Sequence, residues 1–197
     1  MAPHRAWRRT SDPATEPVSL AEARAHLQVD DNDSDTAISA LITAARQYVE
    51  EYTGRALITQ TWALTMDDVP SGTDSILLPR PPLVSVSSLA YVDGDGVTQT
   101  WASSNYRVDS NSEPARLTLA YGVSWPTPRD VSNAVTVTYV AGYGAATAVP
   151  TAIRQAILLL VGDWFTNREA QVVGTVVGRL GFSVEALLSP YRVHGFD

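Results

Sequence analysis

Two helical segments, near residues 19–53 and 150–169, enclose a long stretch of short strands and turns. A helix buries a stripe that recurs about every 3.6 residues, whereas a strand on a core buries every second residue. One packed helical core must therefore be built from parts that are distant in the sequence. We predict an α+β fold, in which a helical bundle core of two to three main helices plus a short C-terminal helix carries an inserted antiparallel β-rich region.

The first helical segment contains two predicted helices. Ser19 can cap the first, and Glu22 completes a capping box because it lies three residues later. After an acidic loop, the second helix carries a stripe of apolar and aromatic residues over 38–52, which we expect to be buried with Tyr48 included. Gly54 should end this helix, since glycine adopts the left-handed conformation at little cost.

The enclosed stretch has the alternation and the turn residues of strands. Asp93-Gly94-Asp95-Gly96 indicates a hairpin turn. The segment 79–82 holds three prolines and marks a connection, because proline cannot donate a hydrogen bond to a neighbouring strand. The predicted strands begin near residue 59 and then occupy residues 83–92, 97–101, 116–121 and 134–140. Short strands in this arrangement favour a small antiparallel sheet, sandwich or barrel.

The remaining segments complete the predicted organisation. Pro150 suits the first turn of the last long helix, which should pack on the second helix. A glycine-punctuated stretch at 170–182 should be mobile, and a short helix from Ser183 should end before Pro190. The predicted parts are a flexible arm at 1–17, a helical core at 18–55 and 149–169, a β-rich insertion at 56–148, and a mobile C-terminal segment at 170–197.

Negative charge is concentrated in the middle of the chain. The net charge is −7, and residues 31–149 contain thirteen acids against six arginines. Binding to nucleic acid phosphates requires clustered Arg or Lys, so this composition disfavours a nucleic-acid-binding protein. The absence of cysteine excludes disulfides and thiolate metal sites. No apolar run approaches the roughly 20 residues that a transmembrane helix needs.

The patterns that could hold a metal or a nucleotide are incomplete. Asp31, Asp33 and Asp35 begin like a calcium loop, but the positions that need glycine and glutamate are Thr36 and Ile42. A solvated loop that caps a helix explains these acids better. The glycines around residue 143 lack the third glycine of a dinucleotide-binding loop. The sequence therefore predicts no metal and no cofactor.

Catalytic patterns are equally incomplete. There is no Gly-x-Ser-x-Gly elbow for a serine nucleophile. Adjacent acids such as Glu50-Glu51 and Asp67-Asp68 could serve a glycosidase only if two carboxylates faced one substrate, and adjacent side chains usually point apart. Tryptophans could form a sugar platform, although Trp62 and Trp164 fall on apolar faces. The sequence predicts no enzyme.

The order of several motifs nevertheless resembles a known family. These motifs are Val18–Ala23, Thr53-Gly54-Arg55 after the second helix, Thr61-Trp62, Leu78–Leu83, Tyr139–Gly144, the helix from Pro150 to Trp164, and Leu187–Arg192. Over about residues 18–193, the chain resembles the head–tail connector (adaptor) family of tailed phages, prophages and gene transfer agents.

This resemblance implies a structural role in a virion or phage-like particle. Family members form a ring, commonly of twelve copies, between the portal and the tail-side stopper or head-closure protein. DNA passes through the lumen without sequence-specific binding, and no membrane is involved. The chain would reside in the bacterial host cytoplasm before assembly and at the head–tail junction afterwards. The resemblance does not decide which end of the chain meets which partner.

Two groups of residues are candidates for these contacts. The acids Asp31, Asp33, Asp35, Asp67 and Asp68 are candidates for a negative lumen or ring surface, where like charge keeps DNA from adhering.

The C-terminal segment is the candidate portal-docking segment, because it combines apolar residues, a tyrosine and an arginine. Its candidate residues are Leu187, Leu188, Pro190, Tyr191 and Arg192. The competing interpretation is that this short helix folds back on its own core, since isolated short helices are marginally stable. Two other function classes stay open: a carbohydrate- or protein-binding module built on the β-rich insertion, and an acid-pair hydrolase.

Overall fold

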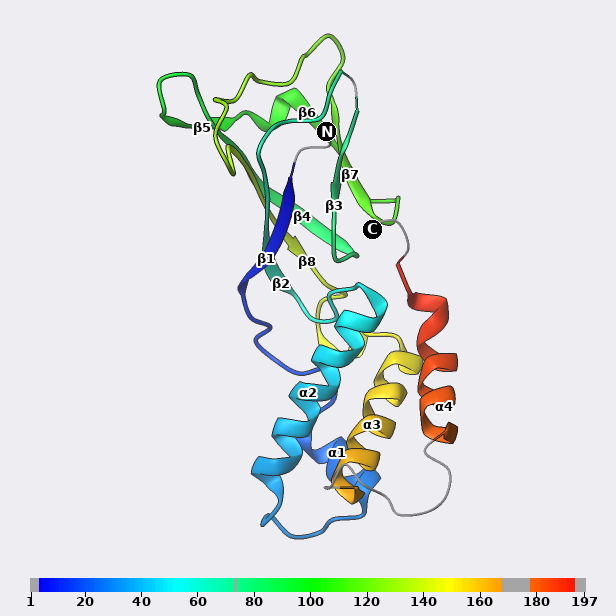
Figure 1. The fold of residues 1–197 in the computed structure, drawn as a ribbon. Helices are drawn as coiled ribbons and strands as arrows, with labels where there is room; N and C mark the ends of the chain where they lie inside the picture. Colours follow the sequence, from blue (N-terminus) through cyan, green and yellow to red (C-terminus); the bar gives the residue numbers. More distant parts are fainter. Residues whose placement is uncertain (1–3, 73, 168–177, 194–197) are drawn as a thin grey trace. The chain divides into compact units, whose positions relative to one another are not determined.

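The computed structural model of the protein describes residues 4–72, 74–167 and 178–193. The chain is α+β, and its helices and antiparallel sheets belong to two separate compact units (Figure 1). The helical unit comprises residues 14–58 and 143–193. The β-rich unit comprises residues 1–13, 59–142 and 194–197. Each unit buries apolar residues of its own and is described by itself.

The capping and stop signals that the sequence predicts for the first three helices are present in the helical unit. Ser19 and Glu22 form the capping box, with the Ser19 N–H and hydroxyl both donating to the Glu22 carboxylate. Gly54 follows the second helix of the chain at a φ of 71°, and Pro150 immediately precedes the third helix. The helices are α1 (Leu20–Leu27), α2 (Asp35–Thr53), α3 (Thr151–Thr166) and α4 (Gly178–Leu188), with the 3₁₀ turns η2 (Ala146–Ala148) and η3 (Ser189–Tyr191).

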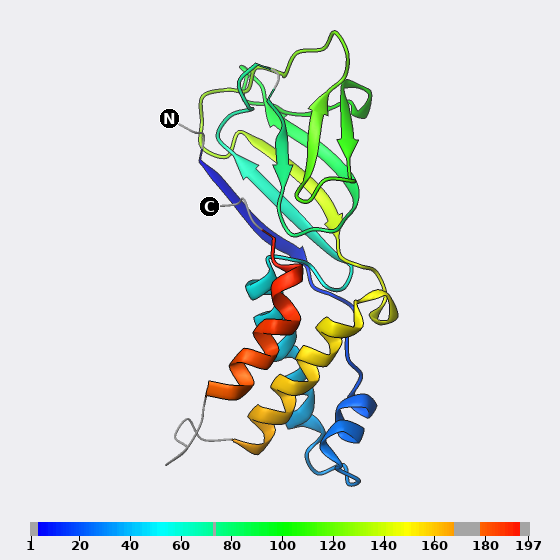
Figure 2. The same cartoon turned by 90° about the vertical axis from the view of Figure 1, so that its right-hand side faces the viewer.

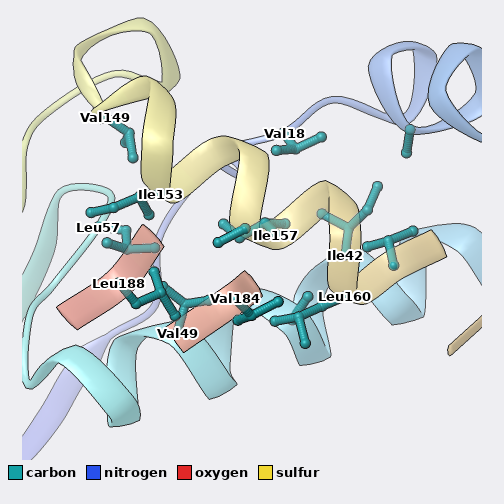
Figure 3. Close-up of a cluster of buried hydrophobic side chains, with 14 of the residues drawn as sticks. Val18, Ile42, Val49, Leu57, Val149, Ile153, Ile157, Leu160, Val184 and Leu188 are labelled. Atoms are coloured by element: carbon teal, nitrogen blue, oxygen red, sulfur yellow. The ribbon is translucent and has the colours of Figure 1, made fainter. Parts of the chain in front are cut away.

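One hydrophobic core holds these helices together. Helices α2, α3 and α4 lie side by side (Figures 1 and 2), and their apolar side chains meet between them (Figure 3). Val49 on α2, Ile153 and Ile157 on α3, and Leu188 on α4 are all 0% exposed. Complete burial of such a side chain contributes roughly 1.5–3 kcal/mol. Because the contributors come from both ends of the sequence, this unit forms only when the chain returns after residue 142.

The β-rich unit contains two antiparallel sheets. The larger has the strand order β1-β2-β8-β4-β5, and the smaller has the order β3-β7-β6. Every second residue of β8 is buried, as expected for a strand with one covered face. The strands are β1 (Arg5–Ser11), β2 (Gln60–Met66), β3 (Ile76–Leu78), β4 (Leu83–Val92), β5 (Thr98–Trp101), β6 (Tyr106–Asp109), β7 (Ala115–Leu119) and β8 (Val135–Ala141), with the 3₁₀ turn η1 (Ser103–Asn105) after β5.

The predicted flexible arm at 1–17 is wrong over residues 5–11. These residues form β1, which pairs antiparallel with β2 from Arg5 opposite Met66 to Arg9 opposite Trp62. The residues of β1 are mostly exposed on both faces. An edge strand of this kind carries no alternation of apolar and polar residues, so its sequence does not reveal it.

The C-terminal helix also differs from the prediction. Helix α4 begins at Gly178, whereas the sequence predicted a start at Ser183. Residues 170–177 of the stretch predicted to be mobile lie outside the described residues.

A helical bundle as the core of the whole chain is too narrow a description. The sheets bury their own large side chains, among them Leu64 on β2, Leu117 on β7 and Tyr139 on β8, each 0–2% exposed. The Tyr139 hydroxyl donates to the Pro79 carbonyl at 2.9 Å, and burial raises the pKa of this phenol well above its ordinary value. The β-rich unit therefore has a hydrophobic core of its own, in addition to the core of the helices.

Candidate docking surface

The predicted docking segment lies against the helical unit. Val184 and Leu188 on α4 are 2% and 0% exposed and belong to the core shown in Figure 3. Leu187 is half-buried against the same core. Leu188 is therefore removed from the docking candidates, because its side chain has no free surface. The interpretation that this helix folds back on its own core describes α4 correctly.

The residues after α4 are held at the C-terminal end of α2. The Arg55 guanidinium donates from Nε to the Tyr191 carbonyl at 2.6 Å, and the Val193 N–H donates to the Thr53 carbonyl at 2.8 Å. Between these two contacts, Gly54 adopts a left-handed φ, and a Cβ built there would lie 3.6 Å from the Val193 Cβ. The predicted stop signal of α2 is thus also a contact point for the end of the chain.

Arg192 connects the C-terminal segment to an aromatic surface. Its guanidinium carbon lies 5.7 Å from the centre of the Tyr52 ring. Tyr52 stacks on Tyr48 at 6.3 Å, and Tyr48 meets Trp164 edge-on at 6.2 Å. Tyr48 is 44% exposed, so the prediction that it lies in the buried stripe is wrong. These residues, together with Tyr191, are called the aromatic–arginine surface below.

The composition of this surface is that of a protein interface. Tyrosine, tryptophan and arginine supply most hot spots in protein–protein contacts, because each combines a large apolar area with a polar group. Of the predicted docking residues, Pro190 and Arg192 are exposed, and Tyr191 is half-buried. Sequence reasoning missed Tyr48 and Trp164 because helical spacing places them on the apolar stripe, and only the packing shows that they lie at its margin.

A buried ionic network is also centred on α2, and no local pattern in the sequence predicts it. Arg46 on α2 is 3% exposed and donates to Glu16 at 2.7 Å and to Glu50 at 2.8 Å. The other Glu50 oxygen accepts from the Leu57 N–H at 3.0 Å. Burial lowers the pKa of Arg46, but the hydrogen bonds and charges of the two glutamates outweigh it and raise the pKa above its ordinary value.

This network fixes the path of the backbone at two places. Glu16 lies on the segment that enters the helical unit, and Leu57 lies on the segment that leaves α2. The Glu50 carboxylate accepts from both the Arg46 guanidinium and the Leu57 N–H. It is therefore not free to act as one acid of the Glu50-Glu51 pair that was considered for a glycosidase.

The candidate acids do not form one group. Asp31, Asp33 and Asp35 belong to the helical unit. Asp31 and Asp33 are exposed, whereas the Asp35 carboxylate oxygen Oδ1 lies 3.4 Å from the guanidinium nitrogen Nη1 of Arg24. Asp67 and Asp68 belong to the β-rich unit, where Asp67 accepts from the Asn133 N–H at 2.8 Å and Asp68 from the Val69 N–H at 2.7 Å. These bonds have the form of turn and loop contacts. Among the described residues, no three acids or histidines are grouped to hold a metal ion.

The tryptophans of the β-rich unit are mostly covered. Trp62 and Trp101 are 8% and 9% exposed. The Trp101 ring stacks on Tyr106 at 5.8 Å and meets the tilted ring of Trp125 at 5.2 Å. These three aromatic residues form a packed cluster, which differs from the open platform that binds a sugar ring. None of the helices in the described ranges combines the length and the apolarity needed to cross a membrane.

A comparison with known families identifies the chain. The model of the head completion protein family matches residues 17–179. The chain belongs to the head completion protein family. The resemblance drawn from the order of motifs is therefore confirmed at the level of the family. The match includes the capping box, Arg46 and Glu50 of the buried network, and most of both units. No curated protein matches the chain significantly.

Solved structures share the fold of this head completion protein along nearly its whole length. A chain from the neck of an empty gene transfer agent particle, computed with C6 symmetry, is 24% identical with a TM-score of 0.79, and the match covers 98% of this chain and 97% of that one. A chain from the virion of a native gene transfer agent particle is 23% identical with a TM-score of 0.78, covering 97% of each. A chain from a native neck with C12 symmetry is 24% identical with a TM-score of 0.75, covering 96% of this chain and 97% of that one.

Proposed function

We propose that this head completion protein is a structural, non-enzymatic adaptor at the head–tail junction of a phage or gene transfer agent particle. Several copies form a ring between the portal protein and the tail-side stopper, and DNA passes through its lumen. The supporting observation is the family match over residues 17–179. The shared fold with neck chains and the C6 and C12 symmetries of the neck structures agree with a ring, for which we propose twelve copies.

We place portal docking on the aromatic–arginine surface. Leu187, Pro190, Tyr191 and Arg192 remain as docking residues, and Tyr48 joins them because its exposed ring adjoins Arg192 through Tyr52. An arginine in such a position can hold a carboxylate or a main-chain carbonyl of the partner. Leu188 supports this surface from within the core.

We also propose that the acids of the middle region give the lumen or the ring surface a negative potential. Asp31, Asp33 and Asp68 are exposed and could act in this way, whereas Asp35 and Asp67 are partly covered. Like charge weakens DNA binding, so tight and salt-sensitive binding of DNA by the purified protein would contradict this assignment.

The decisive experiment removes the gene for this chain from the particle-producing strain and images the particles. We expect heads that contain DNA but lack tails, and we expect the native chain to restore tailed particles. A Tyr48→Ala/Arg192→Glu variant should fold and fail to restore them. The matched control is Arg107→Glu, which reverses an exposed arginine on β6 and should restore tails. Normal tailed particles without the chain would refute the proposed function.

A further inference from the structure

The aromatic–arginine surface has an aromatic end and a positively charged end. Tyr48 and Tyr52 lie one turn apart on α2, with their rings stacked at 6.3 Å. Trp164 on α3 meets Tyr48 edge-on. The Arg192 guanidinium carbon lies 5.7 Å from the centre of the Tyr52 ring. The contacts therefore run from Trp164 through the two tyrosines to Arg192, and a partner that covers this surface must match an aromatic group at one end and a cation at the other.

The charge of Arg192 is not neutralised within the described part of the helical unit. Arg24, Arg46 and Arg154 each pair with an acid of this unit. The Arg55 guanidinium donates to a main-chain carbonyl. By contrast, Arg192 is exposed, and its guanidinium forms no hydrogen bond or ion pair with a described residue. A guanidinium carries five N–H groups in a planar fork that fits the two oxygens of a carboxylate, so a docking partner can supply that carboxylate.

The main chain on both sides of Arg192 is held in place. On one side, the Tyr191 carbonyl accepts from Nε of Arg55 at 2.6 Å. On the other, the Val193 N–H donates to the Thr53 carbonyl at 2.8 Å. Ordering a segment on binding costs conformational entropy, which weakens the affinity. Because these bonds fix the backbone before a partner arrives, little of that cost remains for docking at Arg192.

We propose that the portal segment that docks on this surface presents a carboxylate to Arg192 and an apolar side chain to Tyr48. Tyr48 is 44% exposed, so its ring offers the apolar area that such a side chain covers. This inference rests on the proposed function, because it names the chemistry of the partner at the same surface. Nucleic acid is the less favoured occupant, although bases stack on aromatic rings. The helical unit, residues 14–58 and 143–193, holds eleven acids against seven arginines, and this charge repels phosphates.

Binding of the purified full-length chain to the purified portal protein tests this contact. Arg192→Gln should weaken binding at least about tenfold, and Arg192→Glu should weaken it further because it brings like charges together. Added salt should weaken binding of the native chain and have a smaller effect on Arg192→Gln. Tyr48→Ala should also cost about tenfold but keep the salt dependence. Arg107→Gln and Tyr121→Ala, at exposed positions of the β-rich unit, are the matched controls and should bind like the native chain. Far-UV circular dichroism shows whether each variant is folded.

A second arm tests the contact in particles. Portal variants are selected that restore tails to particles made with the Arg192→Glu chain. We expect an aspartate or glutamate of the portal to be replaced by lysine or arginine, since opposite charges then face each other again. A selection without such a replacement overturns the proposal, as does salt-independent binding or a loss confined to DNA binding.

The binding assay also separates this inference from the proposed function. If the native chain binds the portal protein and Arg192→Gln binds equally well, the carboxylate is overturned while portal docking stands. If the native chain does not bind the portal protein, portal docking itself fails, and this inference fails with it.

Discussion

Replacing Arg46 should destabilise the helical unit far more than replacing an exposed arginine in an ion pair. Arg46→Met keeps most of the apolar stem but removes the guanidinium between Glu16 and Glu50. Glu50 is 6% exposed, so its charge would stay buried without a cation. Breaking a buried pair in this way costs about 3–5 kcal/mol. The Glu16 side chain is 29% exposed, so it can regain water and should add little to this cost.

The assay is urea unfolding followed by far-UV circular dichroism. The four described α-helices all belong to the helical unit, so the helical signal reports that unit even if the β-rich unit unfolds separately. The control is Arg116→Met, which removes an ion pair with Asp109 at 2.8 Å whose arginine side chain is 50% exposed. Because water screens such pairs, we expect a loss of about 0–1 kcal/mol there.

A second substitution identifies the cause. Glu50→Gln removes the buried charge but keeps an oxygen that can accept from the Leu57 N–H. Arg46→Met/Glu50→Gln should therefore be more stable than Arg46→Met by about 1–2 kcal/mol. Equal losses for Arg46→Met and Arg116→Met, or no recovery in the double variant, would refute the view that an uncompensated buried charge causes the destabilisation.

Three further outcomes follow from the packing. Leu188→Ala should destabilise the helical unit by about 2–5 kcal/mol in the same urea assay, while the half-buried Leu187→Ala should cost less, and the reverse order would contradict the burial of Leu188. Ser19→Ala should cost about 1 kcal/mol at neutral pH. Hydrogen bonds from Ser19, and then Arg154, lower the pKa of Glu22, so the bond from the Ser19 hydroxyl to the Glu22 carboxylate contributes above the ordinary value of 4.5 and is lost as pH falls below it. The bond from the Glu22 N–H to the Ser19 Oγ remains in acid, so the cost of Ser19→Ala should fall without vanishing, and a pH-independent cost would contradict this. Tyr139→Phe should lower the thermal stability of the β-rich unit by about 1–3 kcal/mol, because a buried carbonyl loses its donor, and an unchanged melting curve would contradict this.

The features that sequence predicted best are those set by local chemistry. The Ser19 capping box, the Gly54 stop and the hairpin turn after residue 92 all depend on side chains within a few residues of each other, and all three form. Strand β4 has the bounds that were predicted, because its flanking prolines and turn residues mark both ends. The family could also be predicted, since the order of these local motifs survives in the sequence.

The features that sequence missed depend on contacts between distant segments. Strand β1 exists because β2 supplies its partner, and its own residues show no buried face. Arg46 and Glu16 are thirty residues apart, and no local pattern marks them as a buried pair. Leu188 was assigned to an open surface because the spacing of apolar residues on α4 does not say whether they face the core or a partner. The exposure of Tyr48 was missed for the same reason.

The pairing of β1 with β2 has a consequence for exchange of parts between related particles. Residues 59–142 read as an insertion, yet the sheet that they form is completed by a strand from residues 5–11. If residues 59–142 were removed, the excised piece would contain β2 without its edge partner β1. The rest of the chain would retain β1 with no sheet to join. Recombination at the two ends of the insertion therefore yields a hybrid whose sheet combines strands from different parents. A functional exchange must transfer both stretches at once or preserve the matching residues along β1.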